Sequence, residues 1–118
     1  MSHELKTATP TKIEACMVEA LLAHDGNTMQ ERRVDPRFAF FAPVNLRSPQ
    51  APRAIMSAFS REISCGGIGL LHSMPLVAGS CYTIECTRGD VELRHLAEVV
   101  WCRPAGDGWF MSGCRFVN

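Results

Sequence analysis

The sequence predicts a mainly β protein, a six-stranded antiparallel barrel with one additional α-helix near the N-terminus. Three observations support this fold class. Apolar residues alternate at period two in several short segments, Gly and Pro turns separate these segments, and helical spacing of apolar residues occurs only near the N-terminus. The 118 residues, 47% hydrophobic and 20% charged, are enough for one globular domain with its own core.

The N-terminal third divides into a flexible tail at 1–10, a helix at 11–26 and an arginine-rich arm at 27–37. Thr11 and Glu14 form a T-x-x-E capping box, and Gly26 provides a C-terminal stop. Apolar or large side chains then share one side of the helix: Ile13, Met17, Ala20, Leu21 and His24. This stripe packs on the chain's own core or docks a partner, and the sequence leaves both open.

Residues 38–118 are expected to form the barrel. The predicted strands are 38–46, 55–63, 68–73, 82–86, 91–101 and 110–116. The connections contain Pro49 and Pro52, then Gly66-Gly67, then 75–79, 88–90 and 104–108. Short strands separated by such turns are typical of a small antiparallel barrel.

The charge balance limits the partners. The 12 basic and 12 acidic residues cancel, and this disfavours DNA or RNA, which require an excess of positive charge. A small anionic ligand at a local basic site remains compatible with the sequence. No apolar run approaches the roughly 20 residues that span a bilayer, and the first residues lack a signal peptide's apolar core. We therefore expect a cytoplasmic protein without a membrane span.

The sequence gives little support for catalysis or for metal binding. The six cysteines include no CxxC pair, so reduced, core-packed thiols are the simplest interpretation. A zinc site from Cys81, Cys86 and a histidine is conceivable, although the spacing does not favour it. The four histidines are scattered without a neighbouring nucleophile or orienting carboxylate. We expect no enzyme activity, no metal and no cofactor, and keep a cysteine- or metal-dependent hydrolase as a third hypothesis.

The arm carries the first candidate binding residues, Arg32, Arg33 and Arg37. Pro36 disfavours helix in the residue before it, so the arm is expected to be extended. Arginine's planar fork pairs with phosphate and with the O6/N7 edge of guanine. The alternative is a solvated basic loop that Glu31 and the acidic residue before Pro36 partly neutralise.

A second candidate segment runs from Glu62 through Ser64 to Gly67. Residues two apart share one face of a strand, so Glu62 and Ser64 should lie side by side on the outer surface while Ile63 points into the core. A carboxylate can accept two N–H groups from guanine, a hydroxyl can reach a phosphate or a backbone group, and glycine permits close backbone approach. The alternative is a polar strand that ends in a glycine turn.

Trp101 is the third candidate. Alternation along 91–101 places it in the core beside Val99, while stacking of its indole on a base is also physically possible.

Together these segments resemble the PilZ domain, a bacterial receptor module for cyclic di-GMP, over residues 31–117. Arg33–Arg37 is similar to the family's R-x-x-x-R arm, and Glu62–Gly67 is similar to its (D/N)-x-S-x-x-G turn. The pattern V-x-W followed by G-x-x-F is seen in Val99–Trp101 and Gly113–Phe116.

The resemblance implies a PilZ-type barrel that binds cyclic di-GMP and signals to a protein partner when the arm closes on the ligand. Arg33 and Arg37 would bind phosphate and guanine, and Arg32 would stack on or pair with a base, including that of a second ligand molecule. Ser64 and Gly67 would line the site.

One departure from the family pattern supports an alternative function. Position 62 is Glu where the family has Asp or Asn, and the extra methylene moves the carboxylate by about 1.5 Å. Loss of a bidentate pair is worth roughly 1–3 kcal/mol, or one to two orders of magnitude in affinity. The alternative is a ligand-independent PilZ-like adaptor. The helix at 11–26 lies outside the family core and caps the barrel, dimerises or meets a partner; monomer and homodimer both remain open.

Overall fold

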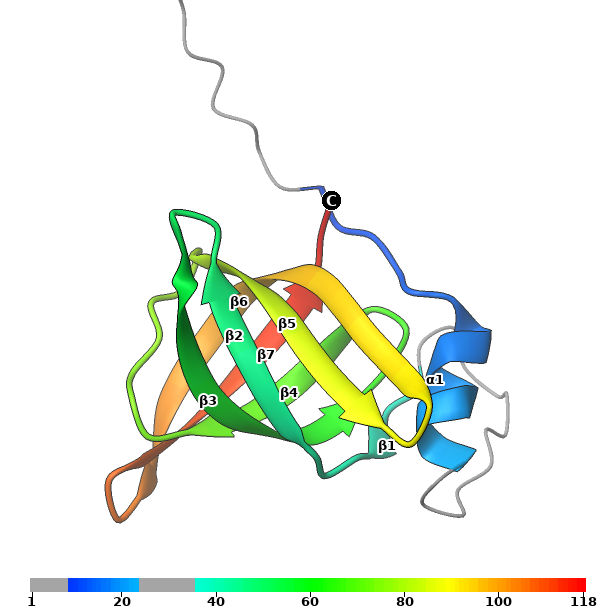
Figure 1. The fold of residues 1–118 in the computed structure, drawn as a ribbon. Coiled ribbons are helices and arrows are strands. Elements are labelled where there is room, and N and C mark those ends of the chain that lie inside the picture. The colour runs from blue at the N-terminus through cyan, green and yellow to red at the C-terminus, as the bar shows by residue number, and fades with distance from the viewer. Residues whose placement is uncertain (1–8, 24–35) are drawn as a thin grey trace, which may run out of the picture.

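The computed structural model describes residues 9–23 and 36–118, so Arg32 and Arg33 lie outside the described residues. The elements are α1 (Ala15–Ala23), β1 (Phe38–Ala39), β2 (Pro43–Ser48), β3 (Ala51–Ile63), β4 (Gly67–His72), β5 (Cys81–Arg88), β6 (Val91–Gly106) and β7 (Trp109–Phe116). The strand order is β1-β3-β2-β5-β6-β7-β4, and pairing of β3 with β4 closes β2 to β7 into a six-stranded antiparallel barrel (Figure 1). This confirms the predicted fold class.

The barrel interior contains most of the alternating apolar residues of the predicted strands, but Ile55 and Phe59 of the predicted strand 55–63 are exposed, at 50% and 47%. Along β6, Leu93, Ala97 and Val99 are buried, and along β7, Cys114 and Phe116 are buried. Successive side chains of a strand point to opposite faces. Where the alternation is regular, a strand therefore supplies every second residue to one continuous core.

The predicted first strand, 38–46, is two strands, β1 and β2, which both pair with β3. The break lies opposite Ser60, whose hydroxyl donates to the Phe40 carbonyl (2.6 Å) and accepts from the Ala42 N–H (2.9 Å). A buried side chain thus satisfies backbone groups that a regular ladder would have paired. A period-two pattern alone does not reveal this interruption.

Two predicted loops are shorter than expected. β3 begins at Ala51, so Pro52 lies within the strand, at a register shift where a ladder N–H is not required. β6 continues through Pro104 to Gly106, and the turn consists of Asp107 and Gly108 at φ 54° and 80°. Positive φ at both central residues is the preferred geometry of a two-residue hairpin.

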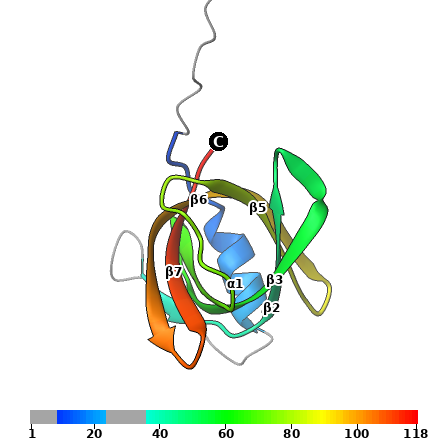
Figure 2. The same ribbon diagram turned by 90° about the vertical axis from the view of Figure 1, so that its left-hand side faces the viewer.

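α1 begins four residues later than the capping box predicted. The N–H of Thr11 donates to the Phe116 carbonyl instead (2.9 Å), so the chain here pairs with the end of β7. Within α1, Val18, Leu21 and Leu22 are fully buried in the barrel core. A view along the barrel shows α1 behind the ring of strands (Figure 2). The helix therefore packs on the chain's own core and covers one end of the barrel.

Candidate functional site

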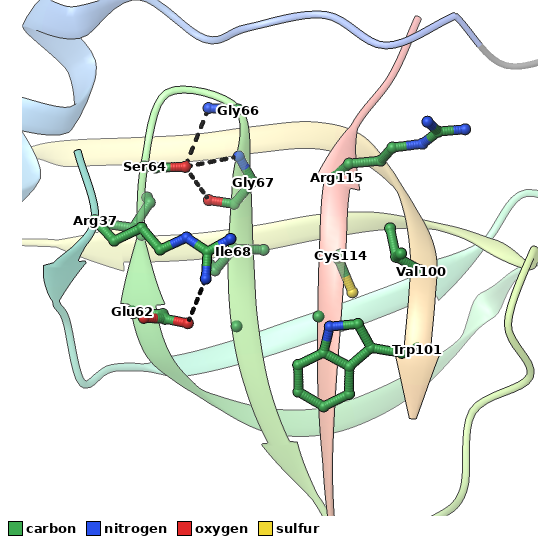
Figure 3. Close-up of a pocket in the computed structure, with 13 residues that line it drawn as sticks. Arg37, Glu62, Ser64, Gly66, Gly67, Ile68, Val100, Trp101, Cys114 and Arg115 are labelled. Carbon is green, nitrogen blue, oxygen red and sulfur yellow. Dashed lines mark hydrogen bonds and ion pairs between the residues drawn. The ribbon is translucent and has the colours of Figure 1, made fainter. Parts of the chain in front are cut away.

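A shallow pocket of about 330 Å³ lies on the outer face of β3, β4, β7 and β6 (Figure 3). Four residues on successive strands are register partners across it: Glu62, Gly69, Gly113 and Trp101. The two central glycines form a floor that has no side chains of its own. Glu62 covers this floor at the buried Gly69 and Trp101 covers it at Gly113, and these two side chains form opposite walls of the pocket. The remaining lining residues are Arg37, Ile63, Ser64, Gly66, Gly67, Ile68, Val100, Cys114 and Arg115.

Each wall of the pocket coincides with a β-bulge. A register shift between Ser60 and Glu62 turns both Arg61 and Glu62 outward, between residues that face the core. A second shift, between Val99 and Trp101, keeps Val99 in the core and turns Trp101 outward. The prediction that alternation buries Trp101 is therefore wrong, because a bulge inserts one residue and reverses the faces that follow it.

Trp101 lies flat against the floor of the pocket. A Cβ added at Gly113 would lie 2.3 Å from the indole Nε1, so only glycine permits this position of the ring. The guanidinium carbon of Arg103 lies 4.8 Å from the ring centroid. Such a cation–π contact helps to fix the orientation of the indole.

The Ser64 side chain shapes the turn between β3 and β4. Its hydroxyl accepts hydrogen bonds from the N–H groups of Gly66 (3.2 Å) and Gly67 (3.1 Å), and the residue is only 8% exposed. The expected position of Ser64 on the outer surface is thus wrong, and of the two partners expected for its hydroxyl the structure shows backbone groups. A Cβ at Gly67 would lie 2.3 Å from the Cys114 carbonyl oxygen, so the close approach of β4 to β7 requires glycine.

Charged side chains surround the pocket. β1 pairs with the end of β3, and this places Arg37 beside Glu62, with 3.8 Å between Nη1 and Oε1. Across the pocket, Arg115 makes two short contacts to one Glu98 oxygen, at 2.7 Å from Nε and 2.6 Å from Nη2. The margin therefore combines an exposed arginine, a carboxylate and a second, firmly held arginine.

The longer side chain of Glu62 has room in this site. A Cβ at Gly69 would lie 3.1 Å from the Glu62 Cγ and 3.5 Å from the Arg61 Nη1. Both side chains therefore lie over the backbone of β4 at Gly69, which is buried. The extra methylene displaces the carboxylate over Gly69 without a clash.

The structure also contains a buried Ser–His pair. His72 Nε2 lies 2.7 Å from the Ser112 hydroxyl, and both residues are fully buried. His72 Nδ1 lies 2.6 Å from the Met74 carbonyl, which can only accept, so Nδ1 carries the proton and Nε2 accepts from Ser112. Burial lowers the pKa of His72. Since no substrate reaches this hydroxyl, the pair stabilises the contact between β4 and β7.

The thiols have the character of core residues. Burial raises the pKa of Cys86 to about 11 and, as the main cause, that of Cys114 to about 12. Both are therefore protonated and poorly nucleophilic at neutral pH. Among residues 9–23 and 36–118, no group of three His, Cys, Asp or Glu side chains is placed to hold a metal ion. In the same part of the chain, no helix has the length and apolar character to cross a membrane.

Several residues that line the pocket were not assigned to it from the sequence, among them Gly69, Gly113 and Arg115. Arg61 is not part of the lining, but its Nη1 lies over Gly69. Gly113 belongs to the G-x-x-F pattern of the sequence, but Gly69 and Gly113 form a floor only through the register of β4 and β7. Arg61 faces outward only because of the bulge. Arg37, Glu62, Ser64, Gly67 and Trp101 are brought to one pocket.

Comparisons with known proteins agree with this architecture. A family model described as the PilZ domain matches residues 31–118. The solved PilZ domain with c-di-GMP of YcgR from Escherichia coli is 19% identical, with a TM-score of 0.58 over 75% of this chain and 79% of that chain. The K. pneumonia MrkH–c-di-GMP complex is 18% identical, with a TM-score of 0.58 over 75% of this chain and 45% of that chain. Curated proteins give no match.

Proposed function

The chain belongs to the PilZ domain family, and from this premise we propose that it is a receptor that binds cyclic di-GMP in the pocket between β3 and β6. The observation that carries the proposal is the row formed by Glu62, Gly69, Gly113 and Trp101. The Glu62 and Trp101 side chains lie over the two glycines, so a planar base binds against these side chains and not against the backbone of the floor. A carboxylate at one end accepts the N–H groups of guanine, and an indole at the other end offers a stacking surface.

The arginines supply the phosphate contacts. Arg37 is 74% exposed beside the carboxylate wall, and the R-x-x-x-R pattern adds Arg33, with Arg32 next to it. Guanidinium groups bind phosphate in a bidentate manner. The pocket is near the lower end of the roughly 300–1,000 Å³ range of ligand sites, so we expect it to hold one guanine and its adjoining phosphate, with the arginines of the arm as partners for the rest of the ligand.

The proposed receptor signals through its arginine-rich arm. Ligand binding changes the position of the arm, and a protein effector in the cytoplasm recognises the changed surface. The receptor releases its ligand intact. The two solved structures to which the chain is similar contain c-di-GMP, and they support this choice of ligand.

A ligand-independent adaptor is the second candidate, and the Arg37–Glu62 ion pair favours it. Each of these groups uses the other as its partner, so a ligand has to separate them. Glu62→Asp discriminates between the two functions. A receptor keeps or improves its affinity, whereas an adaptor acquires binding that the parent lacks.

Isothermal titration with cyclic di-GMP, with GTP as the control nucleotide, tests the proposal. We expect saturable binding that Arg37→Ala weakens at least tenfold. Arg53→Ala is the matched control, because Arg53 is an exposed arginine of β3 outside the pocket. Recovery of unchanged ligand after incubation tests the absence of turnover. No saturation at millimolar ligand would refute the receptor function.

A further inference from the structure

The turn between β3 and β4 is held by the N-terminal segment as well as by its own residues. Inside the turn, the Ser64 N–H donates to the Gly67 carbonyl (2.9 Å) and the Ser64 hydroxyl accepts from two glycine N–H groups. Two turn carbonyls bind donors from elsewhere. Cys65 accepts from the Ile13 N–H and Gly66 accepts from the Phe116 N–H, both at 2.9 Å.

The same segment is tied to the end of β7. The N–H of Thr11 donates to the Phe116 carbonyl, at 2.9 Å, and Pro10 forms a β-bridge with Val117. Phe116 therefore donates to the turn and accepts from the N-terminal segment. The blue ribbon of this segment passes beside the turn in Figure 3.

The hydrogen bond between the Ile13 N–H and the Cys65 carbonyl is buried. Ile13 and Cys65 are each 8% exposed, so water has little access to their hydrogen bond. Ile13 is followed by α1, whose Val18, Leu21 and Leu22 are fully buried. The core anchors the donor, so the Cys65 carbonyl is held in place by a segment that α1 fixes to the barrel.

We propose that Ile13 is a positioning residue of the cyclic di-GMP site, through which ligand binding is coupled to the docking of the N-terminal segment and α1. This inference rests on the proposed function, and it adds residues that precede the matched region 31–118. The turn contributes Ser64, Gly66 and Gly67 to the pocket. A ligand that orders the turn strengthens the hold on Ile13. By reciprocity, release of Ile13 weakens ligand binding by the same factor.

Amide hydrogen exchange of the full chain, with and without cyclic di-GMP, tests the coupling. We expect the ligand to slow exchange of the Ile13 and Phe116 amides about five- to tenfold. The Ser80 amide is the internal control, because it donates to the Val77 carbonyl (3.1 Å) in a turn that is part of neither the N-terminal segment nor the pocket lining. Equal ligand effects on Ile13 and Ser80 would overturn the inference.

A pair of variants tests the reciprocal effect by titration. Ile13→Pro removes the N–H donor, whereas Ile13→Ala keeps it and removes only side-chain packing. At a temperature where both are folded, we expect the proline variant to bind about five- to tenfold more weakly than the alanine variant. Equal affinities would overturn the inference but leave the receptor function intact. No binding by the parent protein would overturn both. If the proline variant does not fold, the exchange experiment on the parent chain decides.

Discussion

Gly113→Ala tests whether Trp101 forms a wall of the ligand site. The added Cβ would lie 2.3 Å from the indole Nε1 and 2.6 Å from Cε2. Carbon contacts are favourable at about 3.5–4.0 Å, so the indole has to move by about 1 Å or more, away from the floor. Stacking of a base on an aromatic ring is worth about 1–3 kcal/mol. Loss of that contact corresponds to a decrease in affinity of roughly five- to 150-fold.

Two measurements follow the ring and the ligand. The chain has two tryptophans, so Trp109→Phe provides a background in which fluorescence reports on Trp101 alone. We expect Gly113→Ala to shift the Trp101 emission and to weaken cyclic di-GMP binding in titration. Because Gly113 faces outward from the core, the variant should remain folded.

A double-mutant cycle identifies the mechanism. In a Trp101→Ala background, Gly113→Ala should have little further effect, because its target ring is already absent. An unchanged affinity despite a displaced Trp101 would show that the indole does not contact the ligand. An unchanged fluorescence spectrum would refute the position of the ring on Gly113.

Three further predictions concern stability and the turn. Leu21→Ala should lower the free energy of unfolding by about 2–5 kcal/mol, because Leu21 is fully buried. Glu19→Ala, on the exposed side of α1, is the control. Equally small effects of the two substitutions in urea denaturation would contradict packing of the helix on the core. Burial lowers the pKa of His72 from 6.5, so the unfolded chain binds more protons. The contribution of neutral His72 to the free energy of unfolding is therefore complete above pH 6.5 and decreases below that pH, by at most about 1.4 kcal/mol per pH unit. In denaturation experiments at a series of pH values, His72→Gln should reduce this pH dependence, and an unchanged dependence would contradict the lowered pKa. Gly67→Ala should force β4 away from β7, since the added Cβ meets a backbone oxygen at 2.3 Å; an unchanged melting temperature and ligand affinity would refute this requirement for glycine.

Local patterns in the sequence determined the barrel and much of the site. Alternation at period two is a property of each strand alone, and it placed Leu93, Ala97 and Val99 in the core. The hairpin at Arg88-Gly89-Asp90 followed from turn chemistry, and Gly89 has φ 60° there. The pairing of Ile63 inward with Glu62 outward was likewise confirmed.

Only the tertiary structure decided which face Trp101 and Arg61 occupy. A bulge leaves only one residue unpaired, yet it reverses the faces of the residues that follow it. The sequence of one strand does not indicate its register with the partner strand. The same holds for the floor, because Gly69 and Gly113 become neighbours only when β4 pairs with β7. The N-terminal helix began late for a related reason: hydrogen bonds to distant backbone groups competed with its capping box. Sequence therefore determined what each segment is, while pairing between segments determined which side chains meet.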